Sequence, residues 1–550
     1  MKIKILLIII LILGTFLRFY KLGEIPNAYS PDELAQGYTA YVILNTGKDE
    51  WGSRNWLNLR SFGDYKPPLQ TLLMIPSVKV FGLTPFAVRF PNALLSVFTI
   101  ALTFFIAQQL FKKYSISLLS TLFMAISPWF LPMSRIALEA NMVIFIISLA
   151  TYLFLKANEN KSTILFIFSS IFFGLSLFTY HSAKIFTPLF LVLLIISQKI
   201  YRHKKFLIIS IFFFGLFLLL NIYQNKQVKT NRTGDIAIFN PTDNWQQVSN
   251  SQYEITQNGL PQPLSRAFYN KVIYLFETFS QSYFSYFSPQ FLLTQGAGET
   301  TYGMIPGFGV LGIIPTLGLA LSLIFLIKKM DIKYYDQLIF LFAIILIPPA
   351  IAAIAKGQYS GNRVSLMMPF LQIISAYGFV TFLSILPVKY KSSFLSLSFL
   401  VFTFFSSSFF IRYFYQGNQI LSQGMLYGHK EANEIIKNSS ADRIIYSRKL
   451  SEPQAYVAFF QQIDPAIIQS ASSSWLEYES KDLLFLDQLG EYSLDKFIFK
   501  EINIPSDSQL SNTLIVGRPE EFRDIKPDYI IYYPNKSKQE PAIYIYHTKK

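Results

Sequence analysis

Long apolar runs recur over the first three quarters of the chain, separated by short polar and mostly basic connections. A transmembrane helix needs about 20 apolar residues, so runs near this length predict membrane spans. Leu69–Gly82 is apolar but short and contains Pro76, which favours an interfacial or re-entrant segment. The pattern therefore predicts about eleven transmembrane helices, at 4–20, 86–110, 115–132, 140–156, 163–179, 184–198, 206–222, 306–327, 337–355, 364–385 and 393–412.

Beyond residue 412 the apolar runs shorten to the length of strands. Alternating patterns predict strands, and patterns of helical period predict two helices. We therefore predict a membrane domain over 1–412 and a small α/β domain over 413–550. The predicted tail elements are strands at Arg443–Ser447, Phe497–Ile502, Thr513–Val516, Tyr529–Tyr533 and Ala542–Tyr546, and helices at Gly428–Asn438 and Pro453–Gln462.

The composition fits a multi-pass α-helical membrane protein. Hydrophobic residues make up 52% and charged residues 15% of the 550 residues, which argues against a large soluble enzyme. The net charge of +15 comes from basic clusters that lie between apolar runs. This is the pattern of a signal for orientation in the membrane, so we expect no nucleic-acid partner. Cysteine is absent, which excludes disulfides and thiolate chemistry. Met1–Leu17 resembles a signal peptide but lacks a small-residue cleavage site, so we expect an uncleaved helix.

The basic connections also predict the orientation in the membrane. Positively charged connections are cytoplasmic by the positive-inside rule, and eleven crossings from an inside start leave the C-terminus outside. The predicted location is a plasma membrane, with the N-terminus cytoplasmic and the tail extracytoplasmic. The cytoplasmic set is Lys2 with Lys4, Lys112–Lys113, Lys156 with Lys161, Lys199–Lys205, Lys328–Lys333 and Lys389 with Lys391; the outer set is 21–85, 133–139, 180–184, 223–305, 356–363 and the tail.

The first outer loop holds the densest group of reactive side chains. Ser30 and Pro31 suit a helix start, where Glu33 would close a capping box. Asp32, in the same first turn, is kept ionised by the helix dipole and is our candidate for a general base. Lys66 precedes a double proline in the same loop and is either an interfacial lysine or a contact for an anion.

Further ionisable residues stand at the outer ends of predicted helices. Glu139 enters an apolar run, where an unpaired carboxylate would be costly, so a partner or a function is implied. Carboxylates facing several cations suit an anionic head group and a hydroxyl to be activated. For each of the others, marking the membrane interface is the alternative role. These others are Arg89, Arg135, His181, Lys184 and Arg363.

Several motifs, in order along the chain, resemble GT-C glycosyltransferases, in the branch of the protein O-mannosyltransferases and lipid A aminoarabinose transferases. The resemblance is strongest over residues 1–200. It is carried by LRFYKLG, PDELAQGYTAY, FGDYKPPL, FGLTPFAVRFPNALL, SPWFLPMSRIALEANMVIF, TYHSAKIFTP, YFSPQFL, YGMIPGFGVLG and GNRVSLMMPF.

The resemblance implies transfer of a sugar from a polyprenyl-phosphate carrier to a hydroxyl on the outer face of the membrane. It implies Asp32 as the base, Glu33 beside it as a contact to a substrate, and Lys66 as the contact to the carrier phosphate. Glu139 would complete the catalytic set, while Arg89, Lys184 and Arg363 are expected at the phosphate, with Arg135 and His181 as further candidates. One base without an opposed nucleophile favours inversion.

Several alternatives stay open. A polymerase or ligase of lipid-linked glycans is the second reading, and a transporter or flippase the third. The acceptor could be a protein, a lipid or a glycan, and the sugar is not specified. No His/Asp/Glu cluster compels a metal, and dependence on a divalent metal stays open.

Overall fold

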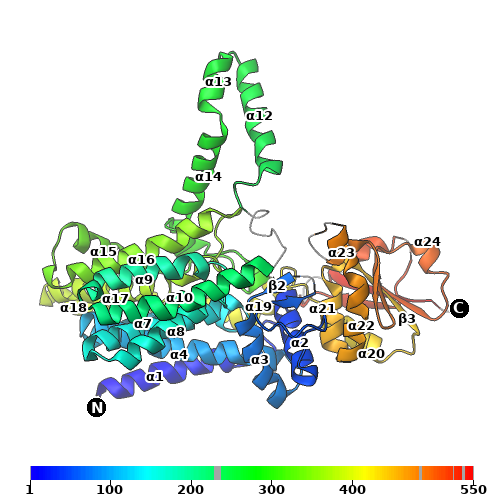
Figure 1. Cartoon of the computed structure of the whole chain (residues 1–550), viewed down its shortest axis with the longest axis horizontal. Helices are drawn as coiled ribbons and strands as arrows, with labels where there is room; N and C mark the ends of the chain where they lie inside the picture. The colour runs from blue at the N-terminus through cyan, green and yellow to red at the C-terminus, as the bar shows by residue number, and fades with distance from the viewer. Residues whose placement is uncertain are drawn as a thin grey trace.

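The chain folds into a helical bundle, a sheet domain and a projecting helical hairpin (Figure 1). The computed structural model describes residues 2–62, 64–227, 237–481, 483, 486–523, 525–535 and 539–548. The N-terminus lies at one end of the bundle and the sheet domain lies beyond the other end (Figure 1). Helices α2 (Pro31–Thr46) and α3 (Pro68–Phe81) lie between the bundle and the sheet domain.

Every apolar segment predicted to span the membrane contains a helix. On length and composition, α4, α7, α10, α16 and α18 could cross a membrane, and α3, α5, α8, α9, α15 and α17 are shorter apolar helices. The helices of the bundle are α1 (Lys2–Phe19), α4 (Pro85–Phe111), α5 (Tyr114–Ala125), α6 (Phe130–Ser134), α7 (Glu139–Asn160), α8 (Thr163–Ser176), α9 (Ala183–Ser197), α10 (Lys204–Gln227), α15 (Ile313–Ile327), α16 (Tyr335–Ala353), α17 (Phe370–Ile385) and α18 (Val388–Ile411).

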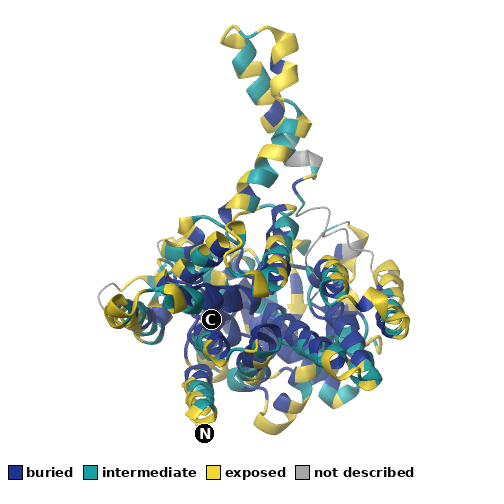
Figure 2. Ribbon diagram, turned by 90° about the vertical axis from the view of Figure 1, so that its left-hand side faces the viewer, coloured by how far each residue is buried: buried dark blue, intermediate teal, exposed yellow. Residues whose placement is uncertain are grey.

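The outside of the bundle is apolar, as expected for a surface solvated by lipid. Viewed along the bundle, buried residues form its centre and exposed residues its rim (Figure 2). Only 22% of the apolar stretch of α10 and 11% of that of α18 is buried, and Leu219 and Phe404 are among their exposed side chains. A monomeric soluble protein rarely exposes a contiguous apolar surface of this extent to water. The protein is therefore a membrane protein.

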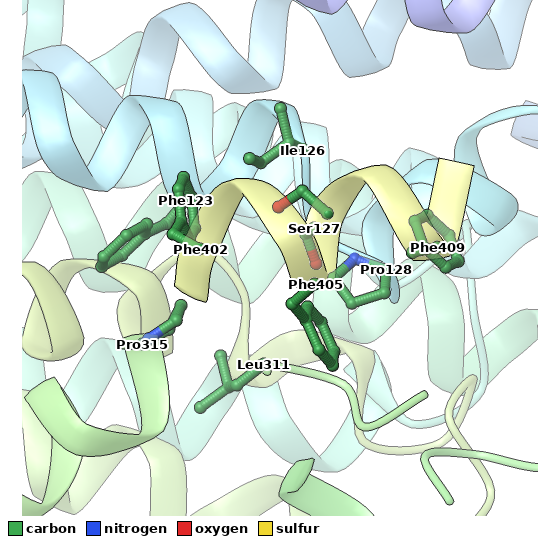
Figure 3. Close-up of a pocket in the computed structure, with 10 residues that line it drawn as sticks. Phe123, Ile126, Ser127, Pro128, Leu311, Pro315, Phe402, Phe405 and Phe409 are labelled. Atoms are coloured by element: carbon green, nitrogen blue, oxygen red, sulfur yellow. The ribbon is translucent and has the colours of Figure 1, made fainter. Parts of the chain in front are cut away.

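Helix α18 joins the bundle through a row of phenylalanines (Figure 3). Phe402, Phe405 and Phe409 are spaced by three and four residues and so share one face of the helix. The ring of Phe402 lies 5.5 Å from that of Phe123 on α5. The crevice between them has a volume of only about 10 Å³, room for a single water molecule, so it is a packing gap and not a ligand site.

The sheet domain contains all five strands predicted from the tail. Strand β3 pairs in parallel with β5 and β6, and the other neighbours are antiparallel. Strand β4 was not predicted because three residues carry too little alternation to stand out. The sheet order is β4 (Tyr492–Leu494), β5 (Phe497–Lys500), β3 (Arg443–Ser447), β6 (Thr513–Gly517), β8 (Pro541–His547), β7 (Tyr529–Tyr532), and the helices are α20 (His429–Lys437), α21 (Pro453–Gln461), α22 (Pro465–Trp475), α23 (Glu477–Ser480) and α24 (Ile504–Asp507). Helix α19 (Gly417–Leu421) precedes them, and its Leu421 lies in the hydrophobic core of the bundle.

The sheet domain shares a hydrophobic core with the first loop. Tyr38 and Phe62 from the loop belong to the same buried cluster as Phe459 and Trp475 from the tail. The Tyr38 hydroxyl also donates to the carbonyl of Ile463 at 2.8 Å. The tail is thus packed against the loop that carries the candidate catalytic residues, and is not a separate body on a linker.

Two further segments differ from simple spans. Leu69–Gly82, expected to be interfacial or re-entrant, forms helix α3, which packs against α2 and α4. Within the predicted long loop 223–305, residues 228–236 lie outside the described residues, and 241–285 form a hairpin of α12 (Pro241–Gln257), α13 (Gln262–Phe268) and α14 (Lys271–Ser285). Short helical turns at Gln290–Thr294 and Thr300–Tyr302 follow the hairpin. In Figure 1 this hairpin projects away from the bundle at a steep angle to the spans.

A buried carboxyl in the first loop makes the stability of this fold dependent on pH. Burial, reinforced by Asp49, raises the pKa of Glu50 from 4.5 to about 8. The unfolded chain releases this proton at lower pH than the folded chain, so stability falls as pH rises from about 4.5 to about 8. We expect Glu50→Gln to remove this loss. The variant's gain in melting temperature over wild type should be small at about pH 5 and reach several degrees at about pH 8.5.

The measurement is thermal unfolding of the detergent-solubilised protein followed by tryptophan fluorescence. Glu24→Gln is the control, because Glu24 is exposed and the Lys21 with which it pairs is exposed too. Equal gains at both pH values would contradict the shifted pKa.

Candidate active site

Five of the predicted site residues line one cavity at the end of the bundle. The cavity has a volume of about 310 Å³. Its polar wall comes from α2, the strand β2 (Asp64–Lys66), the start of α7 and the loops before α9 and after α16. The predicted residues that line it are Asp32, Lys66, Glu139, His181 and Arg363.

An ion pair between Asp32 and Lys66 occupies the polar wall. The Lys66 Nζ lies 2.7 Å from Asp32 Oδ1, and their side chains are 12% and 35% exposed. Burial opposes the charge on Lys66, but the carboxylates of Asp32 and Glu139 outweigh it and raise its pKa. Lys66 is therefore a stable cation at the cavity, paired with Asp32.

Glu139 has the partner that its position in an apolar run required. Gln36 Nε2 donates to Glu139 Oε1 at 2.7 Å. Asp32 and Gln36 are four residues apart on α2 and so share the face turned toward the start of α7. One helix face thus presents Asp32 to the cavity and holds Glu139 in place.

Arg363 comes from a loop held by buried polar groups. Its Nη1 donates to the carbonyl of Lys356 at 2.6 Å. The preceding residues are anchored because the Glu299 carboxylate accepts from the Gly361 N–H at 2.8 Å and the Tyr286 hydroxyl accepts from the Ser360 N–H at 3.2 Å. The loop therefore holds a guanidinium at the cavity without itself being a regular element.

His181 adds a neutral polar group. Burial lowers the pKa of His181 to about 4, and the cations Lys184 and Lys66 act in the same direction. The imidazole is consequently uncharged at neutral pH and can donate at one nitrogen and accept at the other.

The cavity also has an apolar part to its lining. Ile185 of α9 and Ile351 of α16 line it, and both helices belong to the apolar set of the bundle. A ligand in this cavity therefore meets both charged and apolar side chains.

Glu33 and Arg89 do not line the cavity, which corrects their predicted roles. The Arg89 Nε and Nη2 lie 2.9 and 2.8 Å from the two Glu33 oxygens, and both residues are fully buried. Arg89 also donates to the carbonyls of Leu22, Pro26 and Ala28. Glu33 closes the capping box with Ser30. Adjacent residues on a helix point about 100° apart, so Glu33 faces the core when Asp32 faces the cavity.

Arg135 and Lys184 are also placed elsewhere. The Arg135 guanidinium is buried and donates to main-chain carbonyls at the end of α1, which leaves it no access to a ligand. The Lys184 Nζ donates to Asn225 Oδ1 at 2.9 Å in an exposed position and does not line the cavity. Arg135 was predicted as a further candidate and Lys184 as a phosphate contact; neither role fits these positions.

The cavity includes residues that the prediction missed. Tyr180, Tyr302 and Asn362 line it. All three lie in motifs that carried the resemblance, Tyr180 in TYHSAKIFTP, Tyr302 in YGMIPGFGVLG and Asn362 in GNRVSLMMPF, so a signal was present in the sequence. Tyr180 directly precedes His181. Within the described part of the chain, no group of three or more His, Cys, Asp or Glu side chains is placed to hold a metal ion.

Comparison with known proteins points to the same class as the motifs. Residues 65–223 match the family model of dolichyl-phosphate-mannose-protein mannosyltransferase. An uncharacterised protein of Aquifex aeolicus is 30% identical over 189 residues, which are 34% of this chain and 36% of that protein. The chain therefore spans about a third of this relative.

Two solved structures share the fold over nearly the whole chain. ArnT of Cupriavidus metallidurans bound to undecaprenyl phosphate matches with a TM-score of 0.52 and 11% identity, covering 98% of this chain and 97% of that one. The same protein in its apo state gives a TM-score of 0.53 with 10% identity and the same coverage. The predicted fold class, a multi-pass helical membrane protein of GT-C type with a small C-terminal sheet domain, is confirmed, and so is the resemblance to this class.

The buried pair of Glu33 and Arg89 should carry much of the stability of the site. Removing one partner leaves a buried charge uncompensated, which costs about 3–5 kcal/mol. We expect Arg89→Met to lower the melting temperature strongly in detergent. Lys156→Met is the matched control, because it removes a cation from a surface pair with Glu159 worth about 0–1 kcal/mol. Equal melting of the two variants would show that Arg89 does not hold the loop.

Proposed function

We propose that the protein is a glycosyltransferase that moves a sugar from a polyprenyl-phosphate carrier to a hydroxyl acceptor at the extracytoplasmic membrane surface. The observation that carries the proposal is the mixed lining of the cavity: the Asp32–Lys66 ion pair and Arg363 share it with apolar residues of α9 and α16. A lipid phosphate is amphipathic in the same way. The fold shared with a protein solved with undecaprenyl phosphate supports this choice of donor.

The sidedness rests on the charge pattern. The N-terminal Lys2 and Lys4 lie at the end of the bundle opposite the sheet domain (Figure 1). Basic connections favour the cytoplasmic side. The cavity, at the sheet-domain end, is then extracytoplasmic.

In the proposed reaction, Lys66 and Arg363 bind the carrier phosphate and stabilise the charge that develops on it as the glycosidic bond breaks. Asp32, kept ionised by Lys66, accepts the proton of the acceptor hydroxyl as that oxygen attacks the anomeric carbon. The phosphate is a stable leaving group, so protonation of the departing oxygen is not required. Glu139 is engaged by Gln36, which leaves Asp32 as the base and favours inversion at the anomeric carbon.

The proposal is tested first at the base. Asp32→Asn keeps the shape of the side chain and a hydrogen-bonding oxygen for Lys66 but cannot accept the proton. We expect turnover to fall by about 10²–10⁴-fold, with binding of undecaprenyl phosphate retained. The assay is mass spectrometry of glycoconjugates formed from a polyprenyl-phosphate lipid extract. The exposed Glu24, as Glu24→Gln, is the control carboxylate, and near-normal turnover by Asp32→Asn would rule out the assignment.

Lys66 is tested separately at the donor. Lys66→Ala should weaken binding of undecaprenyl phosphate by about tenfold or more, because one cation of the phosphate site is lost. Lys66→Arg, which restores a cation, should recover part of this binding. Binding is measured by competition with a fluorescent lipid phosphate. Unchanged binding by Lys66→Ala would contradict the phosphate role and leave the role of Asp32 to its own test.

A further inference from the structure

A second and more polar pocket lies between the first loop and the sheet domain. It has a volume of about 400 Å³. The loop contributes Asp49, Trp51, Arg60 and Tyr65, and helix α22 contributes Gln469 and Ser473. We call it the loop–α22 pocket. Gln469 also closes its edge, because Nε2 donates to the carbonyl of Asp49 at 2.9 Å and thereby ties α22 to the loop.

The carboxylate of Asp49 is built into this pocket with one oxygen unused. Its Oδ1 accepts from the main-chain N–H groups of Trp51 at 3.0 Å and Ser53 at 2.8 Å. Asp49 is only 1% exposed, and its Oδ2 is buried without a hydrogen-bond partner. The Nε1 of Trp51 is likewise a buried donor without a partner. Burying such groups is costly unless a ligand engages them.

Arg60 is held rigidly at the same place. Its guanidinium carbon lies 3.9 Å from the centre of the Trp51 ring, and Nη2 donates to the Tyr478 hydroxyl at 2.6 Å. The guanidinium carbon of Arg60 also lies 5.7 Å from the centre of the Tyr65 ring. These rings fix the plane of a side chain that has five N–H donors. The pocket is thus lined by a buried carboxylate, that of Asp49, and by a rigidly held guanidinium, that of Arg60.

This lining fits a carbohydrate best. A sugar hydroxyl both donates and accepts, which suits a carboxylate beside indole, guanidinium, amide and hydroxyl groups. A lipid tail would need apolar walls, and a free phosphate would be repelled by Asp49. The aromatic rings around Arg60 provide the limited apolar area that the C–H faces of a sugar can cover.

The β1–β2 hairpin separates the loop–α22 pocket from the catalytic cavity. Strand β1 (Leu59–Ser61) pairs antiparallel with β2, and Arg60 lies directly opposite Tyr65. Residues paired in this way share one face of the hairpin, while Lys66 points to the other face. Tyr65 accordingly lines the loop–α22 pocket and Lys66 lines the cavity.

We infer that the loop–α22 pocket is an acceptor subsite that binds the non-reacting sugars of a glycan whose terminal hydroxyl reaches Asp32. This inference rests on the proposed function. It gives the sheet domain a part in the reaction, because α22 supplies one wall. Binding energy from a remote part of an acceptor can be used at the reacting centre, so an extended glycan should be a better acceptor than its terminal sugar alone.

The first test is binding, which does not depend on turnover. Saturation-transfer NMR of the full-length protein in detergent is recorded with mannotriose, maltotriose and chitotriose as probes, and with a Ser/Thr-containing peptide. Ser473→Trp fills the pocket. Ser474→Trp is the matched control, because Ser473 and Ser474 are both exposed on α22 and each donates to a carbonyl three residues earlier at 2.7 Å. Of these two serines, Ser473 lines the pocket and Ser474 does not.

We expect at least one trisaccharide to bind wild type and Ser474→Trp, and to lose about tenfold or more in affinity with Ser473→Trp. Asp49→Asn, which keeps Oδ1 for the loop amides, should weaken binding of the same trisaccharide by a similar factor. No binding by any trisaccharide, or equal binding by the two tryptophan variants, overturns the inference. If Ser473→Trp weakens binding of the peptide and not of any trisaccharide, the assignment of a carbohydrate ligand is wrong.

The second test is transfer. With the trisaccharide that binds, Ser473→Trp should raise the acceptor KM by about tenfold while the donor KM stays unchanged. Glycan binding without any transfer by wild type would refute the proposed function and leave the binding site standing. Transfer with an acceptor KM unaffected by Ser473→Trp would refute the subsite and leave the proposed function standing.

Discussion

The buried ion pair between Glu33 and Arg89 is the interaction on which the site depends. Arg89 binds both Glu33 oxygens and three carbonyls of the segment between α1 and α2. Two charges in such a place are stable only when their hydrogen bonds are met, and these are. With Glu33 fixed toward the core, the helix geometry leaves Asp32 facing the cavity, within 2.7 Å of Lys66. The pair therefore sets the direction of the proposed base without touching a substrate.

The first loop is held from two sides. Arg89 and Arg135 bind its beginning from the bundle, and the sheet domain packs against α2 through the core shared by Tyr38, Phe459 and Trp475. This arrangement explains the hydrophobic face of the tail, which packs against the first loop. The candidate catalytic residues all come from the membrane domain and not from the tail. Its surface toward the loop is a structural support and, by our inference, one wall of an acceptor site.

The chemistry of the cavity could be predicted only in part, and the reason differs between residues. Glu139 was singled out because a charged group in an apolar run is costly and so points to a partner or a function. Asp32 and Lys66 were singled out because they lie in the same first loop, Asp32 in the first turn of a helix. The structure places all three at one cavity. The positions of Arg89 and Arg135 at the outer ends of predicted helices could not show whether their charges meet a ligand or main-chain carbonyls, and the structure places both against buried main-chain carbonyls. Tyr180, Tyr302 and Asn362 carry no charge, so the cost of an unpaired charge did not select them, although each lies in a motif that carried the resemblance.

The sequence by itself determined the elements: the apolar runs became helices, the alternating runs became strands, and SPDE became a capped helix start. These outcomes follow from local hydrophobic periodicity and local hydrogen bonding, which neighbouring residues decide. Only the tertiary structure decided which side chains meet. How α2 is turned about its axis, with Glu33 toward Arg89 and Asp32 toward Lys66, is set by packing between segments far apart in the chain. So is the placement of α22 beside the first loop, where Gln469 donates to the carbonyl of Asp49. Whether a charge supports the fold or faces a cavity depends on that packing.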